Sequence, residues 1–254
     1  MNRIVTTFFM VACFSTSNPT AVRAQSFSGD FEFAWLDTPD GQHRDMLVLK
    51  QVVFTDALGK RWTVPPKSKI DGASIPRLLW TFAGSPFVGK YRRASVIHDH
   101  FCDIRTELQS KVHLMFKEAM LADGASWWEA NSKYAAVEFA GLCPEKVGVT
   151  TSKLDLFVEN NPLRFNDSAL SQLNAPKRDD ETSAQKFERN KEMVQSKFDP
   201  NERRVFNSLL ALKGAETQEN LESLERTLQN SGLDDQRYEA LVMLVENIYP
   251  EDFK

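Results

Sequence analysis

The sequence has no excess of positive charge and contains few cysteine and histidine residues. Lysine and arginine total 31 against 35 aspartate and glutamate residues, a formal net charge of −4. Because phosphate binding needs a basic excess, we do not expect nucleic acid to be a partner. Only 3 cysteines and 4 histidines are present, and all the histidines precede residue 114. The second half of the chain therefore has no imidazole with which to build a site.

The N-terminal segment has an apolar stretch from Ile4 to Phe14, which is too short to span a bilayer. Arg3 precedes this stretch, and a polar region ending in Ala24 follows it. This order is typical of a secretory signal peptide, so we expect residues 1–24 to be removed and the protein to be secreted or periplasmic. A lipoprotein with Cys13 lipidated is the alternative, although the residues before Cys13 match a lipobox poorly. No transmembrane segment is expected in the mature chain.

Cleavage after Ala24 would remove two arginines and no acidic residue, leaving 29 basic and 35 acidic residues and a net charge of −6. Cys102 and Cys143 would then be the remaining cysteines. In an oxidising compartment the two can pair. Two buried, unpaired thiols are the other interpretation, and the sequence does not decide between them.

The region from Phe31 to Val64 has the pattern of β-strands. Phe31, Phe33 and Trp35 alternate with other residues, and the β-rich runs MLVLKQVVF at 46–54 and RWTV at 61–64 follow. Turn-forming residues separate these runs. We predict a small antiparallel sheet.

After Pro65-Pro66 the apolar period changes to that of helices. Ser74 is placed to cap a short helix through IPRLLWTF, and a second helix is expected over 90–104. Residues TELQ at 106–109 and SWWE at 126–129 each fit a capping box, which predicts third and fourth helices ending near Gly124 and Gly141. The fold class predicted is α+β, a small antiparallel sheet followed by a helical layer.

The remainder of the chain divides into a linker and a helical module. Residues 151–180 are poorly periodic and are interpreted as a linker region. Helices are expected at about 181–198, 200–213, 217–231 and 234–248, with apolar stripes typical of a bundle core. We therefore predict an α+β domain at 27–150 and a C-terminal all-helical module at 181–254, whose protein partner the sequence does not reveal.

Two polar segments lie within this predominantly apolar region. The first, IDGASIPRLLW at 70–80, places Asp71 and Ser74 where a helix N-terminus could hold an anion or oxyanion. Simple capping by both residues explains the same pattern. The second is ASVIHDHFC at 94–102, where His98, Cys102 and Arg105 share one helix face and Asp99 points about 100° away.

His113 can face His98 if the helices on either side of residues 104–106 pack as an antiparallel hairpin. Two imidazoles with Asp71 or Asp99 would suit a divalent metal such as zinc, with Asp71, His98 and His113 as the candidate ligands. Without metal, His98 could be a general base oriented by aspartate, with Ser74 or water as nucleophile. His43 and His100 are predicted to be peripheral.

Five motifs taken together resemble a known bacterial and phage family. They are KSKIDGASIPRLLW, GKYRRASVIHDHFC, Arg105, FKEAM at 116–120 and YAAVEFAG at 134–141. In this order they are similar to Domain of Unknown Function 1353 over about residues 46–141. The matched positions are Asp71, Gly72, Ser74, Pro76, Tyr91, His98, Asp99 and Arg105, whereas Val112-His113 departs from the family's Ala-Asp pair. The resemblance groups these residues into one site without naming a reaction.

Two functions are compatible with these residues. The leading hypothesis is a secreted or periplasmic hydrolase of an envelope substrate such as peptidoglycan. Its catalytic residues would be Asp71, Ser74, His98, Asp99 and Arg105, with His98 as base or metal ligand, Asp99 supporting it and Arg105 binding an anion. The alternative is a non-catalytic envelope or binding protein, in which Asp71, His98 and Arg105 form a buried structural network.

Overall fold

The computed structural model describes residues 25–37, 45–72, 74–76, 79, 90–144, 163, 165 and 167–253. The expected signal peptide at 1–24 lies outside the described residues, as do His43 and most of the short helix predicted after Ser74. Within the described residues, no helix is both long enough and apolar enough to cross a membrane.

The N-terminal strands form two antiparallel sheets instead of the single sheet predicted from the sequence. One sheet has the order β1-β4-β5 and the other the order β2-β3-β6. The run at 46–54 divides into β3 and β4, since each half pairs with different neighbours. The strand bounds are Ser26–Ser28 (β1), Phe33–Trp35 (β2), Met46–Val48 (β3), Val52–Thr55 (β4), Arg61–Val64 (β5) and Lys69–Ile70 (β6).

Three helices follow: α2 at Arg92–Ile104, α3 at Gln109–Ala122 and α4 at Trp127–Ala140. The capping box of α4 is confirmed, with Ser126 and Glu129 bonding each other's backbone N–H. The box predicted at Thr106 is wrong. Arg105 ends α2 in a left-handed conformation, and the chain uses 106–108 to turn, so that α3 begins after the extended Leu108 without a side-chain cap.

The C-terminal helices are α6 at Asp167–Asn174, α7 at Ser183–Gln195, α8 at Pro200–Gly214, α9 at Gln218–Gln229 and α10 at Asp235–Ile248. A short 3₁₀ turn, Glu251–Phe253, follows. The Asp199 side chain caps α8, and Pro200 is the first residue of the helix. Helix α6 lies inside the stretch interpreted as a linker, and its Ala169 and Leu173 are buried. The helix has only 8 residues, too few for its apolar period to stand out in the sequence.

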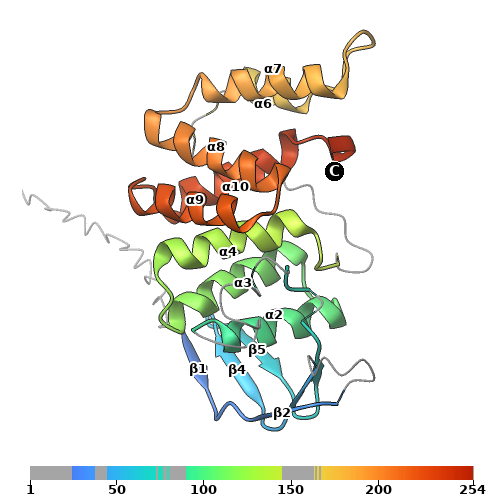
Figure 1. Ribbon diagram of the computed structural model, residues 1–254, viewed down its shortest axis with the longest axis vertical. Coiled ribbons are helices and arrows are strands. Elements are labelled where there is room, and N and C mark those ends of the chain that lie inside the picture. The colour runs from blue at the N-terminus through green and yellow to red at the C-terminus, as the bar shows by residue number, and fades with distance from the viewer. Residues whose placement is uncertain are drawn as a thin grey trace, which may run out of the picture.

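The C-terminal helices stack directly on the α+β region (Figure 1). Helix α4 packs against α9, and the Tyr238 hydroxyl of α10 donates to the backbone oxygen of Asn131 in α4. The buried apolar side chains of both regions belong to one cluster. The α+β class with a C-terminal helical region is therefore confirmed, and the two predicted parts share a core.

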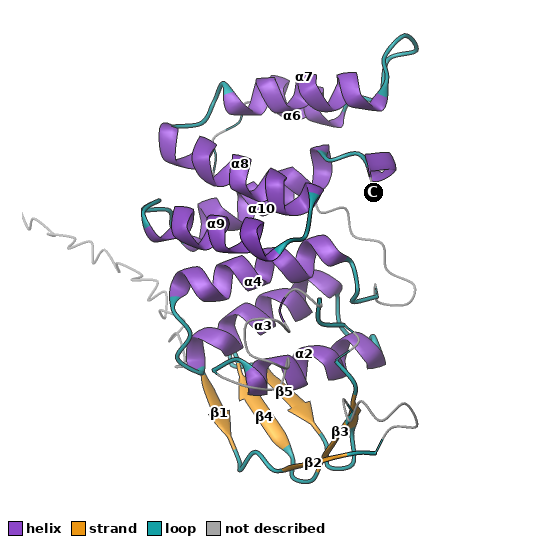
Figure 2. Cartoon of the chain, viewed as in Figure 1, coloured by secondary structure: helices purple, strands orange, loops and turns teal. Residues whose placement is uncertain are grey.

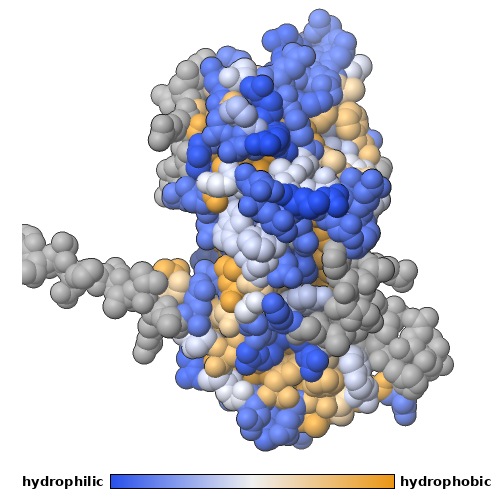
Figure 3. All heavy atoms as spheres, turned by 60° about the vertical axis from the view of Figure 1, so that its left-hand side comes forward, coloured by the Kyte–Doolittle hydropathy of each residue, from blue (hydrophilic) through white to orange (hydrophobic). Residues whose placement is uncertain are grey.

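Figure 2 shows α2 lying across the sheet of β1, β4 and β5, with α3 and α4 layered beyond it. Trp62 of β5 contacts Phe101 of α2 edge to face, with ring centroids 4.9 Å apart. The face in Figure 3 is mainly hydrophilic over the C-terminal helices, and apolar side chains gather towards the strands. Helix α2 also packs against β6, and the loop after β6 contacts Asp99 in the second half of this helix.

Candidate functional site

The candidate site begins at the loop that follows β6, which one aspartate of α2 holds in place. The Asp99 Oδ2 accepts hydrogen bonds from the backbone N–H groups of Asp71 (3.2 Å) and Gly72 (3.0 Å). Its Oδ1 accepts from the backbone N–H of Ser74 (3.1 Å) and from the Ser74 hydroxyl (2.5 Å). Gly72 has φ 71°, a conformation that favours glycine. The DGAS sequence therefore wraps around a carboxylate that another element supplies.

Burial has the largest effect on the pKa of Asp99, which is only 5% exposed. The loss of water raises the pKa of its carboxyl group, although the hydrogen bonds from Ser74 and Gly72 act in the opposite direction. A carboxylate whose pKa is raised is a better proton acceptor near neutral pH than an exposed one. Asp99 thus holds the loop with a carboxyl group that binds a proton more tightly than an exposed aspartate does.

His98 lies beside Ser74 but faces the interior. Its Nδ1 is 3.4 Å from the Ser74 hydroxyl oxygen, and its ring stacks on that of His113 at a centroid distance of 5.2 Å. Phe116 closes another side at 4.8 Å. Complete burial, and secondarily the proximity of His113, hold the pKa of His98 well below its ordinary value. The predicted pairing of His98 with His113 across the helical hairpin is present, and His98 is neutral at physiological pH.

A pocket of 260 Å³ opens on the other side of Ser74. Four of the five residues predicted to be catalytic line it: Asp71, Ser74, Asp99 and Arg105. Lys69 and Asp103 add a further charge of each sign, and the segment containing Leu142 and Pro144 forms another wall. His98 is the predicted catalytic residue that does not line this pocket. The site therefore has an exposed part of mixed charge and a buried part built on imidazole.

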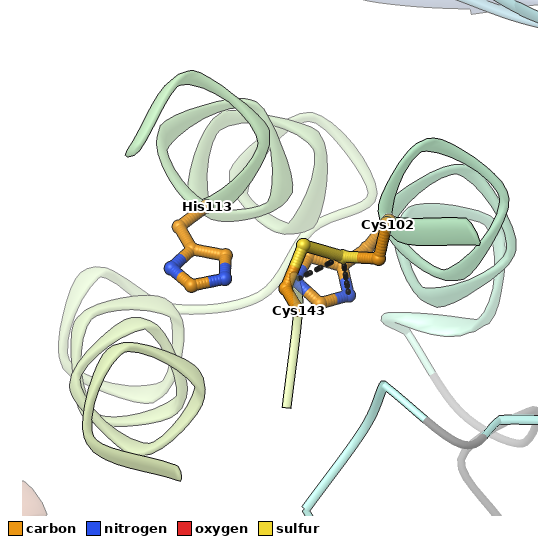
Figure 4. A group of neighbouring side chains, drawn as sticks. Cys102, His113 and Cys143 are labelled. Carbon is orange, nitrogen blue, oxygen red and sulfur yellow. Dashed lines mark hydrogen bonds between the residues drawn. A yellow bond between two sulfur atoms is a disulfide. The ribbon is translucent and has the colours of Figure 1, made fainter. Parts of the chain in front are cut away.

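A disulfide separates the two parts. Cys102 of α2 bonds Cys143, which lies three residues beyond the end of α4, and their Cα atoms are 4.9 Å apart. Of the two alternatives that the sequence left open, the structure has the paired one. Both His98 ring nitrogens lie 3.7 Å from the Cys102 Sγ. Figure 4 shows the bridge between Cys102 and Cys143 beside His113. The bridge ties α2 to the chain beyond α4 and covers the imidazoles.

The described residues contain one group with the composition and spacing of a metal site: His98, Cys102, His113 and Cys143. Asp71, predicted as a ligand together with His98 and His113, is not part of this group and lies in the pocket instead. Cys102 lies four residues after His98 on one helix face, but neither cysteine was predicted to be a ligand. Glu138, whose Oε1 lies 3.1 Å from the His113 Nδ1, was not predicted either.

The remaining predicted residues have simpler placements. The Ser74 hydroxyl donates to Asp99, and most of the helix that Ser74 was predicted to cap lies outside the described residues. Arg105 is the exposed C-cap residue of α2, with φ 51°, and reaches the pocket from there. His100 is half-buried on α2, and burial lowers its pKa.

Comparisons with known proteins agree with the resemblance seen in the motifs. Residues 46–137 match the family described as "Protein of unknown function (DUF1353)", which confirms the expected resemblance over this part of the chain. This range contains the loop at 71–74 and helices α2 and α3. It ends before Cys143, so the disulfide joins the matched region to a residue outside it.

Two similar curated proteins come from the bacterium Sinorhizobium fredii. "Uncharacterized protein y4jT" is 42% identical over 88 residues, which is 35% of this chain and 26% of that protein. "Uncharacterized protein y4iH" is 38% identical over 112 residues, covering 44% of this chain and 45% of that protein. The chain thus spans less than half the length of either relative. No solved structure matches the chain significantly.

Proposed function

We propose that the protein is an exported hydrolase that cleaves a peptide or amide bond in a cell-envelope substrate such as peptidoglycan. The observation that carries this proposal is the pocket in which Asp71, Ser74, Asp99 and Arg105 converge from a loop and a helix. A hydroxyl, carboxylates and cations in one accessible pocket are the groups that acyl transfer to water requires.

In this proposal Ser74 is the nucleophile and Asp99 is its base. The Ser74 hydroxyl already donates to Asp99 Oδ1 at 2.5 Å, so attack on a carbonyl carbon would pass its proton to Asp99. The same proton would then reach the leaving amine, and water would release the acyl group from Ser74. Arg105 and Lys69 would stabilise the negative charge of the intermediate or of a substrate carboxylate.

His98 has a different role from the one expected from the sequence. It is fully buried and neutral, so substrate does not reach it. Its Nδ1 lies 3.4 Å from the Ser74 oxygen, where a proton on Nδ1 would support negative charge on that oxygen. We therefore assign His98 as a positioning residue. Asp71, whose carboxyl group belongs to the pocket lining, would orient the substrate amine or the hydrolytic water.

The export part of the proposal rests on the sequence of residues 1–24. Mass spectrometry of the protein recovered from outside the cytoplasm should find a chain that begins at Gln25. Recovery of exported protein that still carries Met1 would contradict it.

A second candidate is a non-catalytic binding protein, and one observation favours it. Four donors occupy the Asp99 oxygens, so the carboxylate is already used to hold the loop. A pocket with Lys69, Arg105, Asp71 and Asp103 would suit a zwitterionic ligand such as a peptide with a free amine and carboxylate. Binding without turnover is the result that distinguishes this candidate.

The test is digestion of purified peptidoglycan sacculi by the oxidised protein, with mass spectrometry of the released fragments. The wild type should release fragments with new amino groups, and Ser74→Ala and Asp71→Asn should each lower the rate at least tenfold. Glu192→Gln, which changes an exposed carboxylate on α7, is the matched control and should keep the full rate. If the wild type releases nothing but binds soluble muropeptides, the hydrolase assignment fails and the binding protein replaces it.

A further inference from the structure

Behind the pocket, four buried side chains from three segments of the chain gather around one point. His98 and Cys102 come from α2, His113 from α3, and Cys143 from the segment after α4. Their ligand atoms all lie within 4.8 Å of one another, and all four residues are buried. Figure 4 shows the His113 ring beside the bond between Cys102 and Cys143. Two thiolates and two imidazoles are a donor set of structural zinc sites.

The surroundings of His113 are those expected for the side chain of a metal ligand. Among the described residues, neither of its ring nitrogens has a hydrogen bond, although the side chain is 0% exposed. Its Nδ1 lies 3.1 Å from Glu138 Oε1, outside the geometry of a linear hydrogen bond. Metal-bound histidines commonly direct their second nitrogen at a carboxylate in this way. The arrangement leaves Nε2 for a metal ion.

One ring nitrogen of His98 likewise lies near a polar group outside the cluster. Its Nδ1 approaches the Ser74 hydroxyl oxygen at 3.4 Å, which leaves the other nitrogen for the interior. His98 and Cys102 are one helical turn apart, so α2 presents both donors on the same side. In a tetrahedral site with ordinary zinc bond lengths, donor atoms are about 3.3–3.8 Å apart. The four residues therefore need shifts of only about 1 Å once the two sulfurs can separate.

The disulfide decides whether the donor set is available. When Cys102 and Cys143 are bonded, the sulfurs carry no negative charge, and a divalent ion would be held by imidazoles alone in a buried site. A two-electron reductant, such as a dithiol or a phosphine, breaks the S–S bond and leaves a proton on each sulfur while it is itself oxidised. Zinc then displaces both protons, and two thiolates cancel its charge.

We propose that His98, Cys102, His113 and Cys143 form a redox-gated zinc site, closed while the disulfide is intact and opened by its reduction. Cys102 also lines the pocket, so the two sites adjoin, but zinc binding does not depend on the proposed hydrolase activity. Because Ser74 contacts His98, zinc binding would also change the position of the imidazole that lies behind Ser74 in the pocket wall. The protein would thus respond to a reducing environment by binding metal.

The experiment is a titration of the purified protein with Co²⁺, a coloured substitute for zinc, before and after reduction with a phosphine. The reduced protein should bind one Co²⁺ per chain with the absorption bands of tetrahedral thiolate coordination, and zinc should displace it. The oxidised protein should show no such bands. Cys143→Ser and His113→Ala should weaken binding at least tenfold, and Glu138→Gln should weaken it about 10- to 100-fold.

His100→Ala is the matched control, since His100 lies on the same helix outside the cluster, and it should bind as the wild type does. Circular dichroism recorded in parallel covers the case in which the reduced protein loses structure, because zinc should then restore its helix content. Three results would overturn the proposal: no thiolate bands in the reduced protein, equal binding by the oxidised protein, or unchanged binding by Cys143→Ser and His113→Ala. Failure of zinc to restore a reduced, unfolded chain would do the same.

Discussion

Replacement of Asp99 by alanine should release the loop at 71–74 and destabilise the protein. The change removes the acceptor of three backbone N–H groups and one hydroxyl. A hydrogen bond to a charged group contributes about 1.5–3 kcal/mol. The simple sum overestimates the loss, since water can enter from the pocket and the buried charge disappears as well. We expect the free energy of unfolding to fall by about 3–4 kcal/mol.

Urea denaturation measures this change, and hydrogen exchange locates it. The amides of Asp71, Gly72 and Ser74 should lose protection in Asp99→Ala, because they are the donors that lose their acceptor. Asp103→Ala is the matched control on the same helix, where an exposed carboxylate should cost less than about 0.5 kcal/mol. Equal stability of the two variants, with the loop amides still protected in Asp99→Ala, would refute the role given to Asp99.

Three further predictions concern His98, the disulfide and Asp99. Because the pKa of His98 is lowered by folding, the unfolded chain binds the proton more tightly. The free energy of unfolding should therefore fall by up to about 1.4 kcal/mol per pH unit as the pH drops below about 6.5. Denaturation at several pH values measures this dependence, and His98→Gln should remove the part of it that His98 contributes. The Cys102→Ser/Cys143→Ser variant, which opens a loop of sequence separation 41, should lose about 4 kcal/mol, and the denatured, unreduced wild type should have neither thiol open to maleimide in mass spectrometry. The pKa of Asp99 is raised in the folded state, so its contribution to stability should decrease as the pH rises from about 4 through that raised pKa; a carboxyl titration by NMR that places Asp99 at or below an ordinary aspartate would contradict this.

The periodicity of the sequence predicted the helices well because local signals determine where they begin and end. Ser126, Asp199 and Asp234 cap helices as side chains of their type should. The arrangement of the strands into sheets was harder to predict from the sequence. Nothing local distinguishes one strand at 46–54 from two, because the division arises when Val48 pairs with Phe33 and Val52 pairs with Val64. The partners of a strand are set by tertiary structure.

Some residues of the candidate site were brought together by the sequence patterns, but the geometry of the site was not predicted. Helical spacing placed His98 and Cys102 on one face, and hairpin packing brought His113 to His98. The position of Asp99 in the helix gave no indication that a distant loop would wrap around its carboxylate, because the path of that loop depends on β6. The division into an open pocket and a closed imidazole cluster likewise depends on the disulfide, whose formation the sequence left undecided.

The most direct test of the account is an NMR titration of the isotope-labelled, oxidised protein with a soluble muropeptide. If the pocket between the loop, α2 and the segment after α4 is the functional site, the amide shifts should be confined to residues 69–76, 99–105 and 142–144, and Asp71→Asn should weaken them. Shifts centred on the C-terminal helices, or no shifts at any reachable concentration of this ligand, would contradict the assignment of the pocket to an envelope substrate.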